Sequence, residues 1–366
     1  MSPTKPLSGV RIVEIASIGP GPFSAMMLAD HGAEIIRIDR PGGQPTGTAN
    51  KTRDPLLRGR RIVETNLKDP ASVEQVLRLI DGADGLIEGY RPGVMERLGL
   101  GPEVCMKRNP ALVYGRMTGW GQTGPLAKAA GHDINYIALT GALDAVGTKT
   151  SGPVPALNLI GDFGGGGMLM AFGMVSGILQ AKLSGKGSVI DAAMVDGAAL
   201  LMAMPYGLKA AGMWPGCRES NLLDGGAPFY GTYQTKDGEW IALGAIEQPF
   251  WDEFCSLLEL DDPIYAKRLN PGDWDAVKSL LREKFATRTR AEWTELLEGT
   301  DVCFAPVLSM DEAADHPHLA DRAVLQTSDG MLQPAPAPRF DGDAAKIPAQ
   351  MPERLELAEA IKAWER

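Results

Sequence analysis

Short apolar runs alternate with amphipathic stretches along the N-terminal half of the chain. Val10–Ile15 and Glu34–Ile38 predict buried strands, and Pro22–His31 between them predicts a helix that Gly32 ends. The same order returns further along, where we expect helices over Ala71–Asp81 and Val94–Leu98 and strands over Asp84–Glu88, Leu112–Met117 and Ser188–Ala192. Strands and helices in this alternation predict an α/β domain with a parallel, Rossmann-like sheet.

The pattern changes after the last of these strands. Val195–Gly212 predicts a long apolar helix that Pro205 should kink, because proline removes a helical hydrogen bond and clashes with the preceding turn. The short strands expected at Phe229–Tyr233 and Trp240–Leu243 are followed by amphipathic helices. This order is typical of a smaller α+β domain.

A chain of 366 residues exceeds the size at which one hydrophobic core usually stops growing, so we expect two domains. The large Rossmann-like domain is expected over residues 1–195 and 318–366, because the proline-rich tail is too short to fold by itself. A linker helix over 196–222, a small α+β domain over 223–305 and a return linker over 306–317 complete the prediction.

The net charge of −10 argues against a general affinity for nucleic acid or for an acidic membrane surface. Cationic side chains nevertheless gather in the first domain, where they could hold a phosphorylated small molecule. The alternative is that they form structural ion pairs. These residues are Arg37, Arg40, Arg53, Arg58, Arg60, Arg61, Lys68, Arg91 and Arg97.

The four cysteines, Cys105, Cys217, Cys255 and Cys303, are scattered and form no metal-like cluster with the four histidines, so we expect no metal site. This cysteine usage, with an N-terminus that lacks the apolar core of a signal peptide, predicts a cytoplasmic location and no membrane association. The longest apolar run, Met168–Leu179, is shorter than the ~20 residues that cross a bilayer. Apolar side chains lie all around this expected helix, which predicts that protein surrounds it, in part at a subunit interface.

Two glycine-containing segments carry a candidate acid–base pair. Gly131–Tyr136 contains His132, and Gly161–Gly167 contains Asp162 and ends in four consecutive glycines. We expect each segment to form a turn ahead of a helix, so that the two side chains could face one carbon from opposite sides and pass a proton across it. The alternatives are a buried core histidine and an aspartate that caps the helix expected near Phe163.

Several segments together resemble the family III coenzyme A transferases, and within that family the α-methylacyl-CoA racemase branch. The resemblance spans almost the whole chain and rests on the order of Gly19–Pro22, Gly32–Asp39, Asn66–Lys68, Tyr90–Gly93, Thr118–Pro125, Gly131–Asp133, Gly161–Asp162 and Ala305–Val307. It implies a homodimer of two interlocked, ring-like chains with the active site between subunits. It also implies an acyl-CoA substrate, and no cofactor beyond the coenzyme A moiety of that substrate.

The same resemblance assigns the coenzyme A moiety to the first domain. The implied contacts are Arg40, Thr65, Asn66, Leu67, Lys68, Gly89, Tyr90, Arg91, Arg97, Gly131, Ile134, Asn135 and Tyr136. Phosphates favour the fork of arginine and the point charge of lysine, which agrees with the local cationic cluster. A dinucleotide site at Gly19–Pro22 is disfavoured, because Pro20 and Pro22 offer no amide hydrogen to a diphosphate.

By resemblance, the reaction interconverts the (R) and (S) forms of 2-methylacyl-CoA thioesters by 1,1-proton transfer through an enolate. His132 and Asp162 are the implied acid and base, and they rest in opposite protonation states. Asp133 is expected to begin a helix whose free amides receive the enolate oxygen, or to be a plain N-cap. Glu247 is implied to orient the histidine, the alternative being an ordinary surface glutamate.

Two other functions remain open. Transfer of coenzyme A between carboxylic acids would use Asp162 as a nucleophile that forms an acyl anhydride. A non-catalytic acyl-CoA-binding protein is the third possibility. Two features favour the racemase: His132, a second base that a transferase does not need, and the loop Asp224–Pro228, which lacks the glycine run and glutamine of formyl-CoA transferases.

Overall fold

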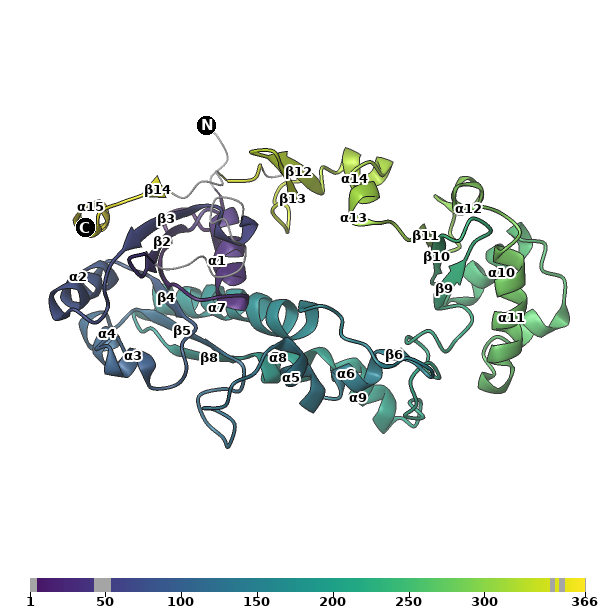
Figure 1. Ribbon diagram of the computed structural model, residues 1–366, viewed down its shortest axis with the longest axis horizontal. Coiled ribbons are helices and arrows are strands. Elements are labelled where there is room, and N and C mark those ends of the chain that lie inside the picture. Colours follow the sequence, from purple (N-terminus) through teal and green to yellow (C-terminus); the bar gives the residue numbers. More distant parts are fainter. Residues whose placement is uncertain (1–4, 43–53, 343–345, 349–352, 366) are drawn as a thin grey trace. The chain divides into compact units, whose positions relative to one another are not determined.

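The computed structural model describes residues 5–42, 54–342, 346–348 and 353–365 (Figure 1). The chain divides into two compact units. The first contains Met1–Thr140, Leu157–Leu201 and Ala314–Arg366, and the second contains Gly141–Ala156 and Met202–Ala313. The sequence pattern placed residues 141–156 in the large domain, whereas in the structure they group with the second unit.

A seven-stranded parallel sheet forms the centre of the first unit, with the strand order β14-β3-β2-β1-β4-β5-β8. The strands are β1 (Arg11–Ile15), β2 (Glu34–Asp39), β3 (Arg60–Glu64), β4 (Gly85–Glu88), β5 (Val113–Thr118), β8 (Val189–Ala193) and β14 (Glu353–Arg354). The Rossmann-like sheet expected from the sequence is therefore confirmed. Its strand order reverses between β1 and β4, the place where open α/β sheets bind ligands at the carboxyl ends of their strands.

Helices cover both faces of this sheet (Figure 1). The helices and hairpin strands of the first unit are α1 (Pro20–Asp30), η2 (Pro55–Leu57), α2 (Pro70–Asp81), α3 (Val94–Arg97), α4 (Pro102–Arg108), α5 (Asp133–Leu139), η3 (Leu159–Met168), α7 (Leu169–Ser184), α8 (Met194–Leu201), α14 (Pro317–Asp321), β12 (Leu325–Ser328), β13 (Met331–Pro334) and α15 (Leu357–Trp364). Helices α2, α4 and α15 share a core with Val13 and Ile15 of β1, and α1 and α7 pack with Ile12 on the opposite face. Both faces of the sheet are therefore buried, which explains the continuous apolar runs of its strands.

Helices η3 and α7 form one stretch, Leu159–Ser184, which is long and apolar enough to span a membrane by length and composition alone. On one side of α7, Met170 and Ile178 are buried in the core beside the sheet. On the other side, Phe172 and Leu183 are 70% and 81% exposed. The sequence predicted protein all around this helix, but within a single chain only one side of it is covered.

The C-terminal tail joins the first unit through buried polar contacts. The Arg58 guanidinium donates to the Asp30 carboxylate at 2.6 and 2.9 Å. It also donates to the Gln333 side-chain oxygen at 3.0 Å and to the Pro334 carbonyl at 2.8 Å. A buried arginine with four acceptors is a structural residue, so Arg58 is not available to a phosphate.

The second unit contains an antiparallel sheet with the order β11-β10-β9. Its elements are α6 (Ala142–Ala145), β6 (Gly147–Thr148), β7 (Gly152–Pro153), α9 (Ala203–Ala210), β9 (Gly231–Gln234), β10 (Trp240–Leu243), α10 (Gln248–Leu257), η4 (Pro263–Lys267), η5 (Pro271–Asp273), α11 (Trp274–Phe285), α12 (Arg290–Leu297), β11 (Phe304–Pro306) and α13 (Met310–Ala313). Its core is rich in aromatic side chains, among them Phe229, Trp251, Phe285 and Trp293. This is the α+β arrangement expected from the sequence.

The long helix expected over Val195–Gly212 is divided into two helices. Helix α8 ends at Leu201 and α9 begins at Ala203. Pro205 lies four residues after Leu201 and has no amide hydrogen to donate to the carbonyl of Leu201, which explains the interruption. The expected kink is therefore a complete break, and it coincides with the boundary between the two units.

Candidate active site

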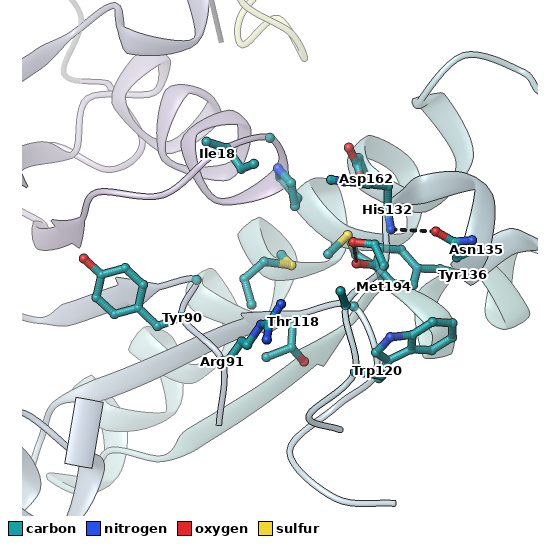
Figure 2. Close-up of a pocket in the computed structure, with 18 of the residues that line it drawn as sticks. Ile18, Tyr90, Arg91, Thr118, Trp120, His132, Asn135, Tyr136, Asp162 and Met194 are labelled. Atoms are coloured by element: carbon teal, nitrogen blue, oxygen red, sulfur yellow. Dashed lines mark hydrogen bonds between the residues drawn. The ribbon is translucent and has the colours of Figure 1, made fainter. Parts of the chain in front are cut away.

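A cavity of about 550 Å³ opens at the carboxyl ends of β1, β4 and β5 (Figure 2). It lies at the point where the strand order reverses, and its volume is in the range of small-molecule sites. The lining is formed by Ile18–Pro20, Gly89–Pro92, Met117–Trp120, Ala127, Ala129–His132, Asn135, Tyr136, Asp162 and Met194. The cavity thus brings His132 and Asp162 together, although they lie on separate segments of the chain.

His132 lies directly before α5, in extended backbone. Its main-chain N–H donates to the side-chain oxygen of Asn135 at 3.0 Å, which ties the residue to the first turn of the helix (Figure 2). The residue is exposed and lines the cavity. His132 is therefore not a buried core histidine.

Tyr136 holds the backbone next to His132. Its hydroxyl donates to the carbonyl of Gly131, and its ring packs edge-on against Trp120 with the centroids 4.8 Å apart. Burial raises the pKa of Tyr136 to about 12, so the hydroxyl stays neutral and remains a donor. The hydrogen bond to Gly131 and the contact with Trp120 therefore fix the loop that carries His132.

A hydrogen bond to Asp133 connects Asp162 to the segment that contains His132. The main-chain N–H of Asp162 donates to Asp133 Oδ2 at 2.7 Å, and Asn158 Nδ2 donates to Asp162 Oδ2 at 3.2 Å. Asp133 is buried at the first position of α5, where His132 is the N-cap. The Asp133 carboxylate thus does not cap its own helix but supports the backbone of Asp162.

Asp162 belongs to a π-helix, η3, and not to a turn or a cap as the sequence suggested. The N-cap of η3 is Asn158, which lies four residues before Asp162. π-Helical turns are rare and are found mostly at functional sites. The π-helical backbone is therefore consistent with a functional role for this carboxylate.

The glycines after Asp162 allow neighbouring helices to approach η3. A Cβ on Gly165 would lie 2.6 Å from the main-chain nitrogen of Ala198 in α8, and one on Gly167 would lie 2.5 Å from the ring of Phe23 in α1. Because glycine has no Cβ, helices α8 and α1 can pack this closely against η3.

The pKa of Asp162 is raised, first by burial and further by the charge of Asp133. The hydrogen bond from Asn158 and the charge of His132 act in the opposite direction. A carboxyl group whose charged form is disfavoured in this way holds its proton to higher pH than an exposed aspartate. Asp162 can therefore act as an acid.

Only some of the expected coenzyme A contacts lie at this cavity. Those that line it are Gly89, Tyr90, Arg91, Gly131, Asn135 and Tyr136. Those that do not are Arg40, Thr65, Asn66, Leu67, Lys68, Arg97 and Ile134. Glu247 belongs to the second unit, where it is exposed at the N-cap of α10.

Several of the cationic residues are engaged in ion pairs inside the first unit. Arg37 pairs with Glu14 and Asp39, Arg60 pairs with the same Glu14, and all four side chains are buried. Arg61 pairs with Glu34 and Arg58 with Asp30, as described above for the tail. Arg53 lies outside the described residues. The alternative of structural ion pairs therefore holds for Arg37, Arg58, Arg60 and Arg61. The other four cationic residues of the described part, Arg40, Lys68, Arg91 and Arg97, are exposed.

Three residues of the site, Ile18, Asn158 and Met194, were not predicted from the sequence. Asn158 could have been found, because it lies four residues before Asp162, a spacing that brings side chains together on a helix. Ile18 and Met194 line the cavity but carry no chemical signal of their own. Within the described part of the chain, no group of three or more His, Cys, Asp or Glu side chains is arranged to hold a metal ion.

The chain matches a known family over nearly its whole length. The family model described as CoA-transferase family III covers residues 7–354. Alpha-methylacyl-CoA racemase from Mus musculus is 44% identical over 91% of this chain and 85% of its own length, and the Homo sapiens protein of that name is 41% identical over 91% and 86%. A solved structure of a CAIB/BAIF family protein from Brucella suis, 24% identical, matches with a TM-score of 0.82 over 98% of this chain and 99% of that one. The chain therefore belongs to CoA-transferase family III.

Proposed function

We propose that this protein is an isomerase that interconverts the (R) and (S) forms of 2-methylacyl-CoA thioesters by 1,1-proton transfer. The observation that carries the proposal is the placement of His132 and Asp162, on two separate segments, at one cavity. The similarity to proteins named alpha-methylacyl-CoA racemase supports the same reaction. The substrate is accordingly an acyl-CoA.

The hydrogen next to a thioester carbonyl is weakly acidic, so catalysis needs a base on one face, an acid on the other and a donor to the enolate oxygen. In one direction the neutral imidazole of His132 removes the proton and the carboxyl group of Asp162 returns one to the opposite face. In the other direction the roles are exchanged. The raised pKa of Asp162 supports the protonated form that the first direction requires.

The enolate oxygen needs a hydrogen-bond donor that is already in place. We assign this role to the main-chain N–H of Asp133, the first residue of α5. The side chain of Asp133 has a separate role, because its carboxylate accepts the N–H of Asp162. Asp133 thus connects the proposed donor to the proposed acid.

The coenzyme A moiety is proposed to lie along Gly89–Arg91 and Gly131–Tyr136. Arg91 is the candidate phosphate ligand at the cavity, because its exposed side chain makes no hydrogen bond or ion pair within the described part of the chain. The exposed residues Arg40, Lys68 and Arg97 remain predicted contacts. The coenzyme A moiety belongs to the substrate, and the proposed mechanism needs no further cofactor.

A homodimer is part of the proposal, with Glu247 completing the site by orienting His132. Its support is the uncovered side of η3 and α7, where large apolar side chains are 40% to 81% exposed: Met168, Phe172, Val175, Leu179 and Leu183. A continuous apolar stripe of this kind is usually covered by protein. The four free cysteines agree with the proposed reducing, cytoplasmic location.

The decisive experiment incubates one epimer of a 2-methylacyl-CoA with the protein in deuterated water. We expect deuterium to enter the α-position while optical purity is lost, without any added acid. If label enters only when a free carboxylate is present, or if coenzyme A moves to that acid, the racemase assignment is wrong. Recovery of unlabelled, optically pure thioester that still binds would identify a non-catalytic acyl-CoA-binding protein.

A coenzyme A transferase is the second candidate, and the position of Asp162 in the lining of the cavity is the observation that favours it. In that reaction Asp162 would attack the thioester, form an acyl anhydride and release coenzyme A as a thiolate. Hydroxylamine would trap the anhydride as a hydroxamate. Trapping that persists in His132→Ala would favour the transferase, because this step needs only the carboxylate.

A further inference from the structure

A series of charged side chains, of which Glu88 and Arg116 are buried, adjoins the loop that lines the cavity after β4. Glu88, the last residue of β4, is 1% exposed. Its Oε2 accepts the main-chain N–H of Tyr90 at 2.7 Å, and its Oε1 accepts Nε of Arg116 at 3.1 Å. Arg116, its direct partner on β5, continues through Nη2 to Glu96 Oε1 on α3 at 2.9 Å.

These charged side chains hold the loop at both ends. Glu88 precedes the cavity-lining segment Gly89–Pro92, and Glu96 follows it on the next helix. Within the segment, the exposed side chain of Arg91 makes no hydrogen bond or ion pair in the described residues, so its position depends on the backbone that carries it. That backbone is fixed at Tyr90 by the Glu88 carboxylate.

We propose that Glu88 is a positioning residue for acyl-CoA binding: its carboxylate holds the Tyr90–Arg91 backbone so that Arg91 meets the phosphates of the substrate. This inference rests on the proposed function. Glu88 does not touch the reacting carbon, and it acts on affinity and not on proton transfer. The expected signature is therefore a change in KM with little change in kcat.

The ionisation state of Glu88 gives the inference a second signature. Burial raises the pKa of Glu88 to about 7, although the N–H of Tyr90 and the charge of Arg116 oppose the rise and Glu96 adds to it. Burial and then the charge of Glu88 raise the pKa of Tyr114 on β5, whose hydroxyl donates to the carbonyl of Leu100. The ionised carboxylate accepts from both donors and pairs with the charge of Arg116, whereas protonation removes that charge and turns one oxygen into a donor and a weaker acceptor. Affinity for the coenzyme A moiety should therefore fall as the pH decreases below about 7.

The test compares wild type with Glu88→Gln, whose single amide oxygen can accept from Tyr90 or from Arg116 but not from both, and which loses the charge that pairs with Arg116. We expect the Kd for coenzyme A and the KM for a 2-methylacyl-CoA to rise about tenfold, with kcat changed less than about twofold. The fall in affinity below neutral pH should also become smaller. The phosphates of coenzyme A titrate equally in both proteins, so the difference between the two profiles belongs to Glu88.

Two further variants make the result decisive. Glu34→Gln breaks the Arg61 ion pair at the other end of the sheet, and it should leave Kd, KM and kcat unchanged. Glu96→Gln removes only the ion pair between the exposed Glu96 and Arg116, so it should raise Kd about twofold to threefold. This variant decides the question if Glu88→Gln does not fold. Wild-type affinity and pH dependence in Glu88→Gln, or in Glu96→Gln in that case, would overturn the inference. Failure of wild type to bind coenzyme A would instead refute the proposed function.

Discussion

The two candidate acid–base residues occupy different environments. His132 is exposed in extended backbone before α5, whereas Asp162 is half-buried in a π-helix that two other helices approach closely. Partial removal from water disfavours the charged form of a carboxyl group, so the environment of Asp162 raises its pKa above that of an exposed aspartate. The π-helical backbone and the close helix packing therefore surround the carboxylate and not the imidazole.

Replacement of either residue should have the largest effect. We expect His132→Ala and Asp162→Asn each to reduce α-deuterium exchange by about 10²- to 10⁴-fold, which is the usual contribution of a positioned acid or base. The Kd for acyl-CoA, measured by calorimetry, should stay within a few-fold of wild type, which also serves as the control for folding. Unchanged exchange in one variant would remove that residue from the mechanism.

The packing around Asp162 should be sensitive to a single methyl group. Gly165→Ala places a Cβ against the backbone of α8, so we expect a loss of about 1–3 kcal/mol in the free energy of unfolding. Thermal or denaturant unfolding measures this loss. Gly207→Ala is the matched control, because its Cβ would meet nothing within 4 Å in α9, and it should be neutral or stabilising. Equal stability of the two variants would contradict the close packing of η3.

The charge of Asp133 should set part of the proton affinity of Asp162. Asp133→Asn keeps an oxygen for the Asp162 N–H but removes a charge that raises the pKa of Asp162. The reaction that needs protonated Asp162 slows as the pH rises through that pKa, so this limb of the pH–rate profile should move to lower pH. At neutral pH we expect the rate to fall about threefold to tenfold. An unmoved limb would show that Asp133 acts only through its hydrogen bond.

Asn158 should act in the opposite direction and with the smallest effect. Its hydrogen bond favours the ionised form of Asp162, so Asn158→Ala should raise the pKa of Asp162 and move the same limb to higher pH. We expect the rate at neutral pH to change by less than about threefold. Displacement in the same direction as Asp133→Asn would contradict the electrostatic account of both residues.

Much of the first unit could be predicted from apolar periodicity. Strand β1 and strand β2 are continuous apolar runs because helices bury both faces of the sheet. Strand β3 was missed because it begins with Arg60 and Arg61, which read as polar in a sequence pattern. In the structure Arg60 is fully paired inside the unit, with Glu14 as its partner. No local pattern predicts such a pairing, because the two residues are far apart in the sequence.

Apolar periodicity and residue identity are local properties, so they were enough to predict strands β1, β2, β4, β5 and β8 and the chemical types of the candidate pair. Local patterns could not show that Asp162 lies in a π-helix, that Asp133 supports its backbone, or that Arg37, Arg58 and Arg60 are engaged in internal ion pairs. The physical reason is that burial and long-range partners set a group's pKa and its availability to a ligand. Both come from segments that the fold brings together.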